Sequence, residues 1–335
     1  MKHFYLFLSL FIILSFGLKE SIFKDDYTLI LPKGFPEPYI PIDNKLTQSR
    51  VELGKQLFFD VRLSRNNSLA CASCHNPKLA FTDGSKLSIG NKGELLSRNA
   101  PTLTNIAYQD SGLLFDRGVP TLEMQILVPI QEHKEFDFNI QLIAERLKKD
   151  TSFQSLSLKA YHSEITPFVI TRAIAAFERT LISGNSPYDK FNNGDSTALT
   201  DDQQHGMDLF FNKKTNCSSC HSGFNFTNYA FENNGLYKKY TNEGRFRLTQ
   251  IDTDQALFKV PTLRNIELTA PYMHDGSFEN LEEVIEHYNT GGKNHPNKSE
   301  LIQPLDLSNK EKRDLIAFLK SLTDESFIQN SLFQN

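Results

Sequence analysis

The chain has 335 residues and a formal net charge of −4, and 39% of its residues are hydrophobic. This length is sufficient for two modest domains, each with its own core. No long basic run could follow a phosphate backbone, so we expect no nucleic-acid partner. With 27 Phe, 11 Tyr and no Trp, any aromatic side chain that passes an electron must be Phe or Tyr.

Residues 1–20 are predicted to be a signal peptide or an N-terminal anchor. Lys2 and His3 precede an apolar run from Phe4 to about Leu18, and Lys19 follows at once. The run is shorter than a comfortable membrane span, which favours an export signal. No small-x-small cleavage site is obvious, so an uncleaved single-helix anchor is the alternative. Both interpretations place the rest of the chain outside the cytoplasm, and we expect a periplasmic protein.

All four cysteines lie in two Cys-x-x-Cys-His sequences, at 71–75 and 217–221. Two thiols three positions apart can each add to a haem vinyl group, and the histidine that follows supplies the proximal nitrogen. A lone Cys-x-x-Cys could be half of a zinc site or a redox dithiol. Because histidine follows directly in both copies, the motifs predict two covalently bound haem c groups. The predicted haem-binding residues are Cys71, Cys74, His75, Cys217, Cys220 and His221.

The two halves of the chain resemble each other beyond these motifs. Pro-Thr-Leu-x-Asn-Ile occurs at 101–106 and again at 261–266, and Leu-Glu occurs at 122–123 and at 281–282. Such a repeat is typical of a duplicated domain with one haem in each copy. Residues 183–200 are rich in Asn, Asp, Ser, Gly and Thr and are predicted to link the copies.

We therefore predict a mostly α fold of two cytochrome c-like haem domains related by internal duplication. The first domain is expected over residues 45–190 and the second over 200–323. Ser308 and Glu311 form a predicted capping box ahead of an apolar helix face. Segments 142–148 and 169–181 have similar helical patterns, and no sustained period-two strand pattern appears.

The segment after the shared Leu-Glu pair is expected to cover the distal face of each haem. In the second copy it contains His287 and Tyr288, and either side chain could bind iron. The equivalent residues of the first copy are Val128 and Pro129, which cannot. The repeat thus predicts one capped haem and one open haem.

The sequence resembles the bacterial di-haem cytochrome c peroxidase family, including its MauG branch. The resemblance extends from about Gly54 to Thr323 and rests on specific motifs. These motifs are Cys-x-x-Cys-His-Asn-Pro at 71–77, Arg-Asn-Ala-Pro-Thr at 98–102, Lys-Val-Pro-Thr-Leu-Arg-Asn at 259–265 and Thr-Ala-Pro-Tyr-Met-His-Asp-Gly at 269–276.

The resemblance implies different roles for the two haems. The haem on His75 would react with peroxide, and the haem on His221 would receive electrons and pass them on. Gln125 and Glu135 match the distal glutamine and glutamate of the peroxide pocket. A pocket carboxylate is suited to moving a proton between the two peroxide oxygens, and the glutamine amide to orienting them. On spacing alone, Glu135 could instead be a solvated charge beside Lys134.

The resemblance also implies a calcium ion and an inter-haem aromatic. Asn99, Thr269 and Pro271 match a calcium site between the domains, formed by one side-chain oxygen, two backbone carbonyls and waters. Phe115 occupies the position of an aromatic, usually tryptophan, through which electrons cross between the haems.

Two further departures from the common family pattern affect the haem ligands. Many members have a histidine sixteen residues after the first proximal one that blocks the peroxide-reacting haem, and here that residue is Asn91. Many have methionine as distal ligand of the second haem, where this chain has Tyr288, as in the MauG branch. His287 and Met273 remain alternative ligands. Tyrosinate lowers the haem potential, whereas methionine raises it.

The leading functional hypothesis is a cytochrome c peroxidase, which reduces hydrogen peroxide to water. Its electrons would come from a small periplasmic cytochrome or copper protein. The alternative is a MauG-like enzyme that oxidises residues of a partner protein, which Tyr288 and Asn91 favour. A plain di-haem electron carrier would need two six-coordinate irons, and Val128-Pro129 argues against it. By analogy with the family, a homodimer is expected.

Overall fold

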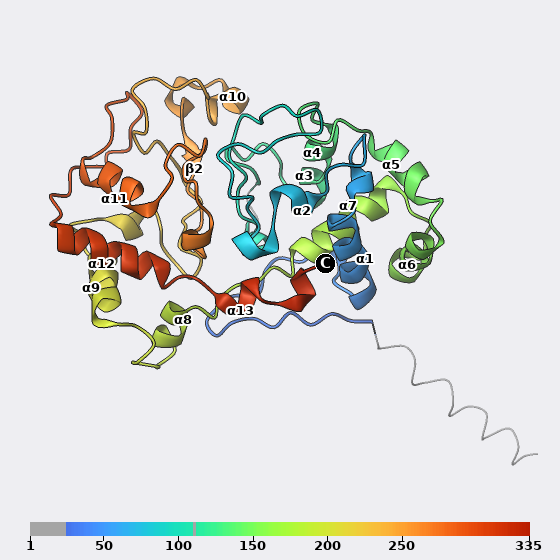
Figure 1. The fold of residues 1–335 in the computed structure, drawn as a ribbon, viewed down its shortest axis with the longest axis horizontal. Coiled ribbons are helices and arrows are strands. Elements are labelled where there is room, and N and C mark those ends of the chain that lie inside the picture. Colours follow the sequence, from blue (N-terminus) through green and yellow to red (C-terminus); the bar gives the residue numbers. More distant parts are fainter. Residues whose placement is uncertain (1–24, 110–111) are drawn as a thin grey trace, which may run out of the picture.

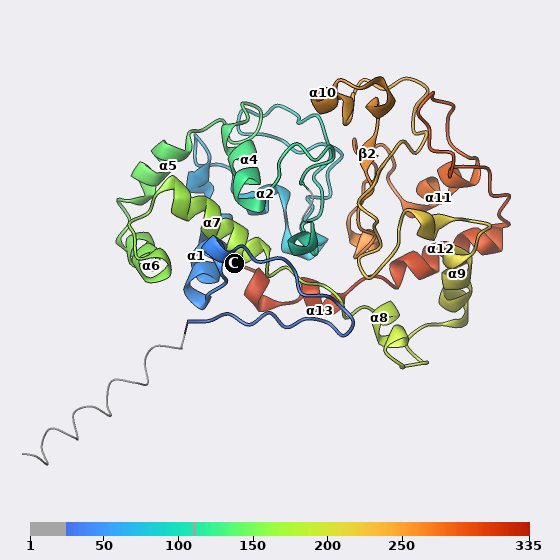
Figure 2. The ribbon, with the colours of Figure 1, turned by 180° about the vertical axis from the view of Figure 1, so that it is seen from behind.

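The computed structural model describes residues 25–109 and 112–335, so the predicted export segment 1–20 lies outside the described residues. The described chain forms two helical lobes side by side (Figures 1 and 2). Within those ranges, no helix has both the length and the apolar character needed to cross a bilayer.

The first lobe contains the helices that precede residue 180. They are α1 Gln48–Phe58, α2 Cys71–Cys74, α3 Leu122–Gln125, α4 Leu127–Gln131, α5 Ile140–Leu147, α6 Thr151–Tyr161 and α7 Pro167–Glu178. Their starts follow from local sequence: Thr47, Asp150 and Thr166 cap α1, α6 and α7 with side-chain oxygens. The helical patterns predicted at 142–148 and 169–181 correspond to α5 and α7.

The second lobe contains most of the remaining elements, while α8 and α13 lie along the lower edge of both lobes (Figure 1). These elements are α8 Pro187–Asn192, α9 Asp201–Phe211, β1 Phe231–Glu232, α10 Phe246–Thr249, β2 Phe258–Lys259, α11 Leu281–Asn289, α12 Asn309–Lys320 and α13 Glu325–Ile328. The predicted capping box is confirmed, because Ser308 and Glu311 each bind the other's backbone N–H. The antiparallel pair of β1 with β2 is only two residues long.

Each lobe is built on one close helix crossing at a glycine. A Cβ atom on Gly54 of α1 would lie 1.8 Å from the carbonyl oxygen of Ala173 in α7. A Cβ atom on Gly206 of α9 would lie 1.9 Å from the carbonyl oxygen of Asp314 in α12. The two helix pairs therefore touch backbone to backbone, which only glycine permits.

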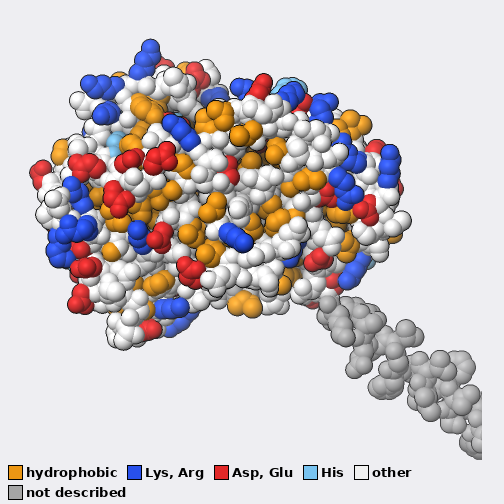
Figure 3. All heavy atoms as spheres, viewed as in Figure 1, with side chains coloured by type: hydrophobic (Ala, Val, Ile, Leu, Met, Phe, Trp, Pro, Cys, Tyr) orange, Lys and Arg blue, Asp and Glu red, His pale blue; other side chains and the backbone are white. Residues whose placement is uncertain are grey.

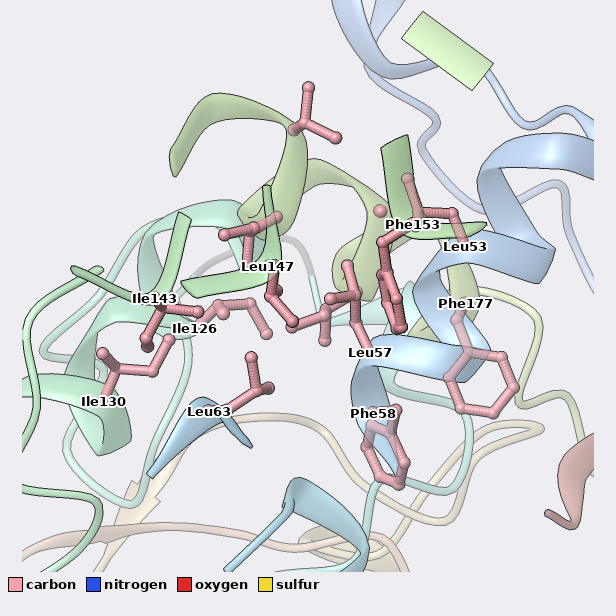
Figure 4. Packing of buried hydrophobic residues seen from close by; sticks show 14 of the residues in the cluster. Leu53, Leu57, Phe58, Leu63, Ile126, Ile130, Ile143, Leu147, Phe153 and Phe177 are labelled. Carbon is pink, nitrogen blue, oxygen red and sulfur yellow. The ribbon is translucent and has the colours of Figure 1, made fainter. Parts of the chain in front are cut away.

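The core of the first lobe contains residues that are far apart in the sequence (Figure 4). Leu53 and Leu57 of α1 pack in the same cluster as Ile143 of α5. Phe327 and Phe333, near the C-terminus, also belong to this cluster. The ring of Phe327 lies 5.6 Å from that of Phe81, just after the first haem motif. The end of the chain thus completes the core of the first lobe.

Residues 25–47 run beneath both lobes before α1 begins (Figure 1). The ring of Phe35 packs 4.6 Å from that of Phe224 in the second lobe, and the guanidinium of Arg264 lies 5.0 Å from the Phe35 ring centroid. The segment returns to the first lobe, where the carbonyl of Asp25 accepts a hydrogen bond from Gln48 N. It therefore connects the two lobes. On the face drawn in Figure 3, side chains of both charges are scattered over both lobes.

Candidate active site

Both haem-attachment motifs open into the same internal space. One cavity of about 1070 Å³ is lined by Cys74 and His75 from the first motif and by residues of the second. A neighbouring cavity of about 50 Å³ is lined by Cys71 together with Cys74 and His75. The residues of the second motif that line the larger cavity are Cys217, Cys220 and His221. The lobes thus bring the two motifs to one shared cavity.

The two proximal histidines are held in the same way. His75 Nδ1 donates a hydrogen bond of 2.9 Å to the carbonyl of Phe81, and His221 Nδ1 donates one of 3.1 Å to Phe226. Burial lowers the pKa of both imidazoles, so both are neutral at pH 7. Because a carbonyl can only accept, Nδ1 carries the proton and Nε2 keeps its lone pair. This is the arrangement of an iron-binding histidine.

The four cysteines are unpaired thiols. Burial raises the pKa of Cys74 to about 11 and that of Cys220 to about 11, so both are protonated at neutral pH. The first pair of thiols lies on the single turn of α2, and the second pair begins and immediately follows a 3₁₀ turn at Cys217–Ser219. Two adjacent thiols and one neutral imidazole are the groups that covalent haem c requires. The residues present therefore fit two such groups.

The predicted peroxide residues line the same cavities as His75. Gln125 ends α3 and Glu135 follows α4, and both side chains line both cavities. Val128 and Pro129 lie between them on the larger cavity and offer no iron ligand. Burial raises the pKa of Glu135 to about 7, and the nearby charge of Glu132 acts in the same direction. Glu135 can therefore both accept and give a proton near neutral pH.

The loop of Glu135 is closed against the turn that contains Asn91. Asn91 N donates a 2.9 Å hydrogen bond to the carbonyl of Glu135. A Cβ atom on Gly90 would lie 1.6 Å from the carbonyl oxygen of Lys134, so the two loops touch through their backbones. Asn91 lines neither cavity, whereas Gly90 lines the smaller one. The backbone of Asn91 thus holds the Glu135 loop in place without entering either cavity.

Asp137 fixes the other end of the same loop. Its carboxylate is only 5% exposed and lies 2.8 Å from Arg65 Nε and 2.9 Å from Lys92 Nζ. His133 also contacts it, at 2.8 Å. The hydrogen bonds from His133, Lys92 and Arg65 hold the pKa of Asp137 well below its usual range. The loop is therefore tied to two separate segments by charge-assisted hydrogen bonds.

Helix α11 presents Tyr288 to the cavity beside the second motif. Tyr288 lines the cavity, whereas the buried His287 ring does not and instead hydrogen-bonds the carbonyl of Asn234 through Nε2, at 2.9 Å. Met273 also lines the cavity, but its sulfur accepts a 3.1 Å hydrogen bond from Asn234 Nδ2. Burial raises the pKa of Tyr288 to about 12, so its phenol is protonated unless a nearby cation compensates.

The three residues of the predicted calcium site come from both lobes. Asn99, Thr269 and Pro271 all line the larger cavity. Asn99 N donates a 2.9 Å hydrogen bond to the carbonyl of His274 in the other lobe. Among the described residues, no group of three or more His, Cys, Asp or Glu could hold a metal ion. A calcium ion here would have to bind mainly to neutral oxygens.

Phe115 lies at the same junction. Its carbonyl accepts a 2.8 Å hydrogen bond from Lys259 N, and its ring lines the cavity. The next residue, Asp116, is fully buried and pairs with Arg98 of its own lobe at 2.9 Å and with Arg247 of the other lobe at 2.8 Å. Burial alone would raise the pKa of Asp116, but the two guanidinium groups lower it below its ordinary value of 3.8.

Sequence reasoning missed two charged residues of the site. Glu178 ends α7, is 3% exposed and lines the smaller cavity beside Cys71, and its Oε2 has no hydrogen-bond partner. Burial raises its pKa to about 8. Lys259 lines the larger cavity, and its side-chain ammonium donates a 3.1 Å hydrogen bond to Gln109 Oε1. A carboxylate at the end of a largely apolar helix could have indicated Glu178. Lys259 opens the motif at 259–265, but the motif does not indicate that its side chain lines the cavity.

These features define a class of protein: a two-haem c-type cytochrome with unequal haem pockets. The cavities beside His75 are lined by the titratable carboxylate of Glu135, and the phenol of Tyr288 lines the cavity that contains the second motif. Two pockets of such different chemistry distinguish an enzyme from a simple electron carrier.

Known proteins are similar to this chain over most of its length. Residues 48–197 match the family model described as di-haem cytochrome c peroxidase, and residues 203–323 match that for cytochrome c. Methylamine utilization protein MauG of Methylorubrum extorquens is 38% identical over 88% of this chain and 83% of its own. Cytochrome c551 peroxidase of Nitrosomonas europaea is 35% identical, over 86% and 85%. The structure of a MauG-like protein associated with microbial copper homeostasis aligns with a TM-score of 0.87 at 36% identity, over 92% of this chain and 98% of that one.

The chain belongs to the di-haem cytochrome c peroxidase family, which includes MauG. The predictions of the family, of two haem c groups and of a peroxidase-type oxidoreductase are confirmed. The relatives support the peroxidase and the MauG-like function equally. Hydrogen peroxide is the substrate that this activity implies.

Proposed function

We propose that this chain reduces hydrogen peroxide at the pocket beside His75, with electrons that a small cytochrome or copper protein delivers through the second haem. The observation that supports this most directly is that Glu135 and Gln125 line the cavity with His75, while Val128 and Pro129 on the same cavity offer no iron ligand. When bound, each haem supplies an iron that exchanges single electrons, and the one on His75 supplies the place where peroxide reacts.

The side chains of the chain provide the proton chemistry. The Glu135 carboxylate accepts a proton from the incoming peroxide and returns it to the oxygen that leaves as water. The Gln125 amide orients the peroxide for this transfer. Over a full turnover, hydrogen peroxide, two electrons and two protons give two waters. The contacts from Asn91 and Asp137 keep Glu135 in place meanwhile.

The direct test is steady-state turnover of the purified holoprotein. Peroxide consumption with a small reduced cytochrome or copper protein should oxidise two equivalents of donor for each peroxide. EPR of the ferric protein should show one high-spin, five-coordinate haem. Two low-spin haems that remain low-spin on reduction would contradict the proposal.

The MauG-like alternative is favoured by Tyr288, which lines the cavity together with the second motif. A tyrosinate ligand stabilises oxidised iron, so the second haem would store an oxidising equivalent rather than supply an electron. In that case the enzyme would oxidise residues of a partner protein. Peroxide turnover that requires one particular protein, and is absent with small redox donors, would support this alternative.

Several further features accompany this proposal. Asn99, Thr269 and Pro271 would bind one calcium ion, whose hard oxygen ligands they supply. We place the protein in the periplasm, with residues 1–20 as the export signal or anchor. The equivalent helix crossings at Gly54 and Gly206 support an internal duplication of the haem domain.

A further inference from the structure

A line of aromatic side chains leads from the cavity to the surface of the second lobe. Phe258 and His274 both line the cavity, and their rings stack with centroids 4.0 Å apart. The ring of Tyr240 lies 6.2 Å from Phe258 and 6.0 Å from His274. The ring of Tyr237 follows, 5.4 Å from that of Tyr240.

The outer end of this line is a phenol paired with a carboxylate. Tyr237 Oη donates a 2.7 Å hydrogen bond to Asp275 Oδ2. The other carboxylate oxygen, Oδ1, is buried and has no hydrogen-bond partner. Tyr237 itself is half-buried, and the next two residues, Lys238 and Lys239, are exposed. Tyr237 thus lies next to solvent-exposed residues, whereas part of the Asp275 carboxylate is buried.

The carboxylate distinguishes Tyr237 from Tyr240. Tyr240 Oη donates to the side-chain amide oxygen of Asn233, at 3.1 Å, and an amide does not accept the proton permanently. A phenol that loses an electron becomes a strong acid and must release its proton to remain a neutral radical. Asp275 is a base already within hydrogen-bond distance for that transfer. Phenylalanine and histidine are harder to oxidise than tyrosine. Phe258 and His274 therefore form no radical themselves, and their packed rings shorten the electron-transfer distance between the cavity and the tyrosines.

We propose that Tyr237 and Asp275 form the port through which single electrons enter the enzyme. In each step, the Tyr237 phenol gives one electron inward by way of Tyr240 and the Phe258–His274 stack, and its proton moves to Asp275 Oδ2. A reduced one-electron redox protein at the surface then gives one electron to the tyrosyl radical, and the proton returns from Asp275 to the phenol oxygen. Two such steps supply the two electrons that one peroxide consumes. The inference rests on the proposed function, because peroxide is the oxidant.

The first experiment is freeze-quench EPR of the holoprotein after one equivalent of peroxide, without donor. The wild-type protein should give a tyrosyl radical signal, and Tyr237→Phe should lose it. Tyr161→Phe is the matched control, because Tyr161 Oη donates to the Asn44 amide and lies in the other lobe. An equal signal in wild type and Tyr237→Phe would overturn the proposal, as would the absence of any tyrosyl signal while peroxide is consumed.

The second experiment is stopped-flow oxidation of a small reduced cytochrome. In Tyr237→Phe the donor should be oxidised roughly tenfold more slowly or worse, about 1.4 kcal/mol of barrier, while peroxide alone reacts with the ferric protein at the wild-type rate. Asp275→Asn should slow the same step and remove its solvent deuterium isotope effect, and unchanged donor oxidation in both variants would reject the port. If peroxide does not react with the wild-type protein at all, the proposed function itself fails. The haem absorption spectrum and the melting temperature verify that each variant is folded and loaded.

Discussion

Glu135 and Asp137 lie two residues apart on one loop, and their surroundings move their pKa values in opposite directions. Burial raises the pKa of Glu135 to about 7, whereas the hydrogen bonds from His133, Lys92 and Arg65 lower that of Asp137. One carboxylate can therefore exchange protons at neutral pH while the other stays ionised and holds the loop. Such a divergence is typical of catalytic pairs in which one group reacts and the other positions it.

The first prediction concerns the pH dependence of the peroxide reaction. Because the ionised form of Glu135 must accept the proton, kcat/KM for peroxide should rise with pH through about 7 and level off above it. Glu135→Gln should remove this limb and lower kcat by roughly 10²–10⁴-fold. Glu132→Gln, on the same loop but exposed, is the control; it should keep the limb and move it to lower pH, because the charge of Glu132 helps to raise the pKa of Glu135. If the rise of kcat/KM with pH persists in Glu135→Gln, a group other than Glu135 must cause it.

The second prediction concerns the ligand of the second haem. Tyr288→Phe should change the absorption and EPR spectra of one haem only, because it removes the phenol that lines the cavity with the second motif. Met273→Leu should leave both spectra as they are, since the Met273 sulfur already accepts a hydrogen bond from Asn234. The opposite pattern would make Met273 the ligand.

At the residue scale, the sequence predicted the haem-binding cysteines and histidines because the chemistry requires contiguous spacing. Glu135 and Gln125 came only from family resemblance, since a single carboxylate beside a lysine has no distinctive local pattern. The hydrogen bond from Asn91 N to the Glu135 carbonyl joins two backbone groups 44 residues apart. Because it involves no side chain, the sequence could not indicate it. Lys259 was missed because only the fold brings it to the cavity.

Helices α1 and α7 can pack this closely because α1 has a glycine, Gly54, at their contact. Helices α9 and α12 depend on Gly206 in the same way. The third prediction is that Gly54→Ala lowers the free energy of unfolding by about 1–3 kcal/mol, because its Cβ would overlap the Ala173 carbonyl and force the helices apart. Gly206→Ala should cost a similar amount in the second lobe. Denaturant unfolding measures both. Ser155→Ala, on the exposed face of α6, is the control and should change stability little. A neutral Gly54→Ala would show that the crossing can relax.

At the element scale, the long helices were predictable because their apolar spacing and caps are local. The short elements were not: α3 and α4 break at residue 126, and β1 with β2 is held only by pairing across 26 residues. The cytochrome c-like character of both domains follows from the haem motifs, whose geometry requires a helical turn before each histidine. The N-terminal segment 25–47 has no periodic pattern, because its contacts with Phe224 and Arg264 are entirely tertiary.

The whole molecule is joined at Asp116, the buried carboxylate that accepts from both lobes. The fourth prediction is that Asp116→Asn destabilises the protein at pH 7 by about 3 kcal/mol, the lower end for a broken buried ion pair, because Arg247 is half exposed. The depressed pKa means that the ionised carboxylate stabilises the fold above about its ordinary value of 3.8. This contribution is lost as the pH falls through the folded-state pKa.

The difference between wild type and Asp116→Asn should therefore be full at neutral pH and shrink in acid. Thermal unfolding across this pH range measures it. Asp254→Asn is a suitable control, because its pairing with Arg245 at 3.3 Å lies within the second lobe. A pH-independent difference would mean that Asp116 acts by shape and not by charge.

The C-terminal residues that complete the first core also constrain how the protein is made. Phe327 and Phe333 pack beside Phe81, which follows the first haem motif and whose carbonyl holds His75. The ribosome reaches these two residues only after both haem motifs and the whole second lobe. The pocket beside His75 can therefore mature only after Phe333 has been synthesised, and a chain that stops before Phe327 would leave the core behind that pocket incomplete.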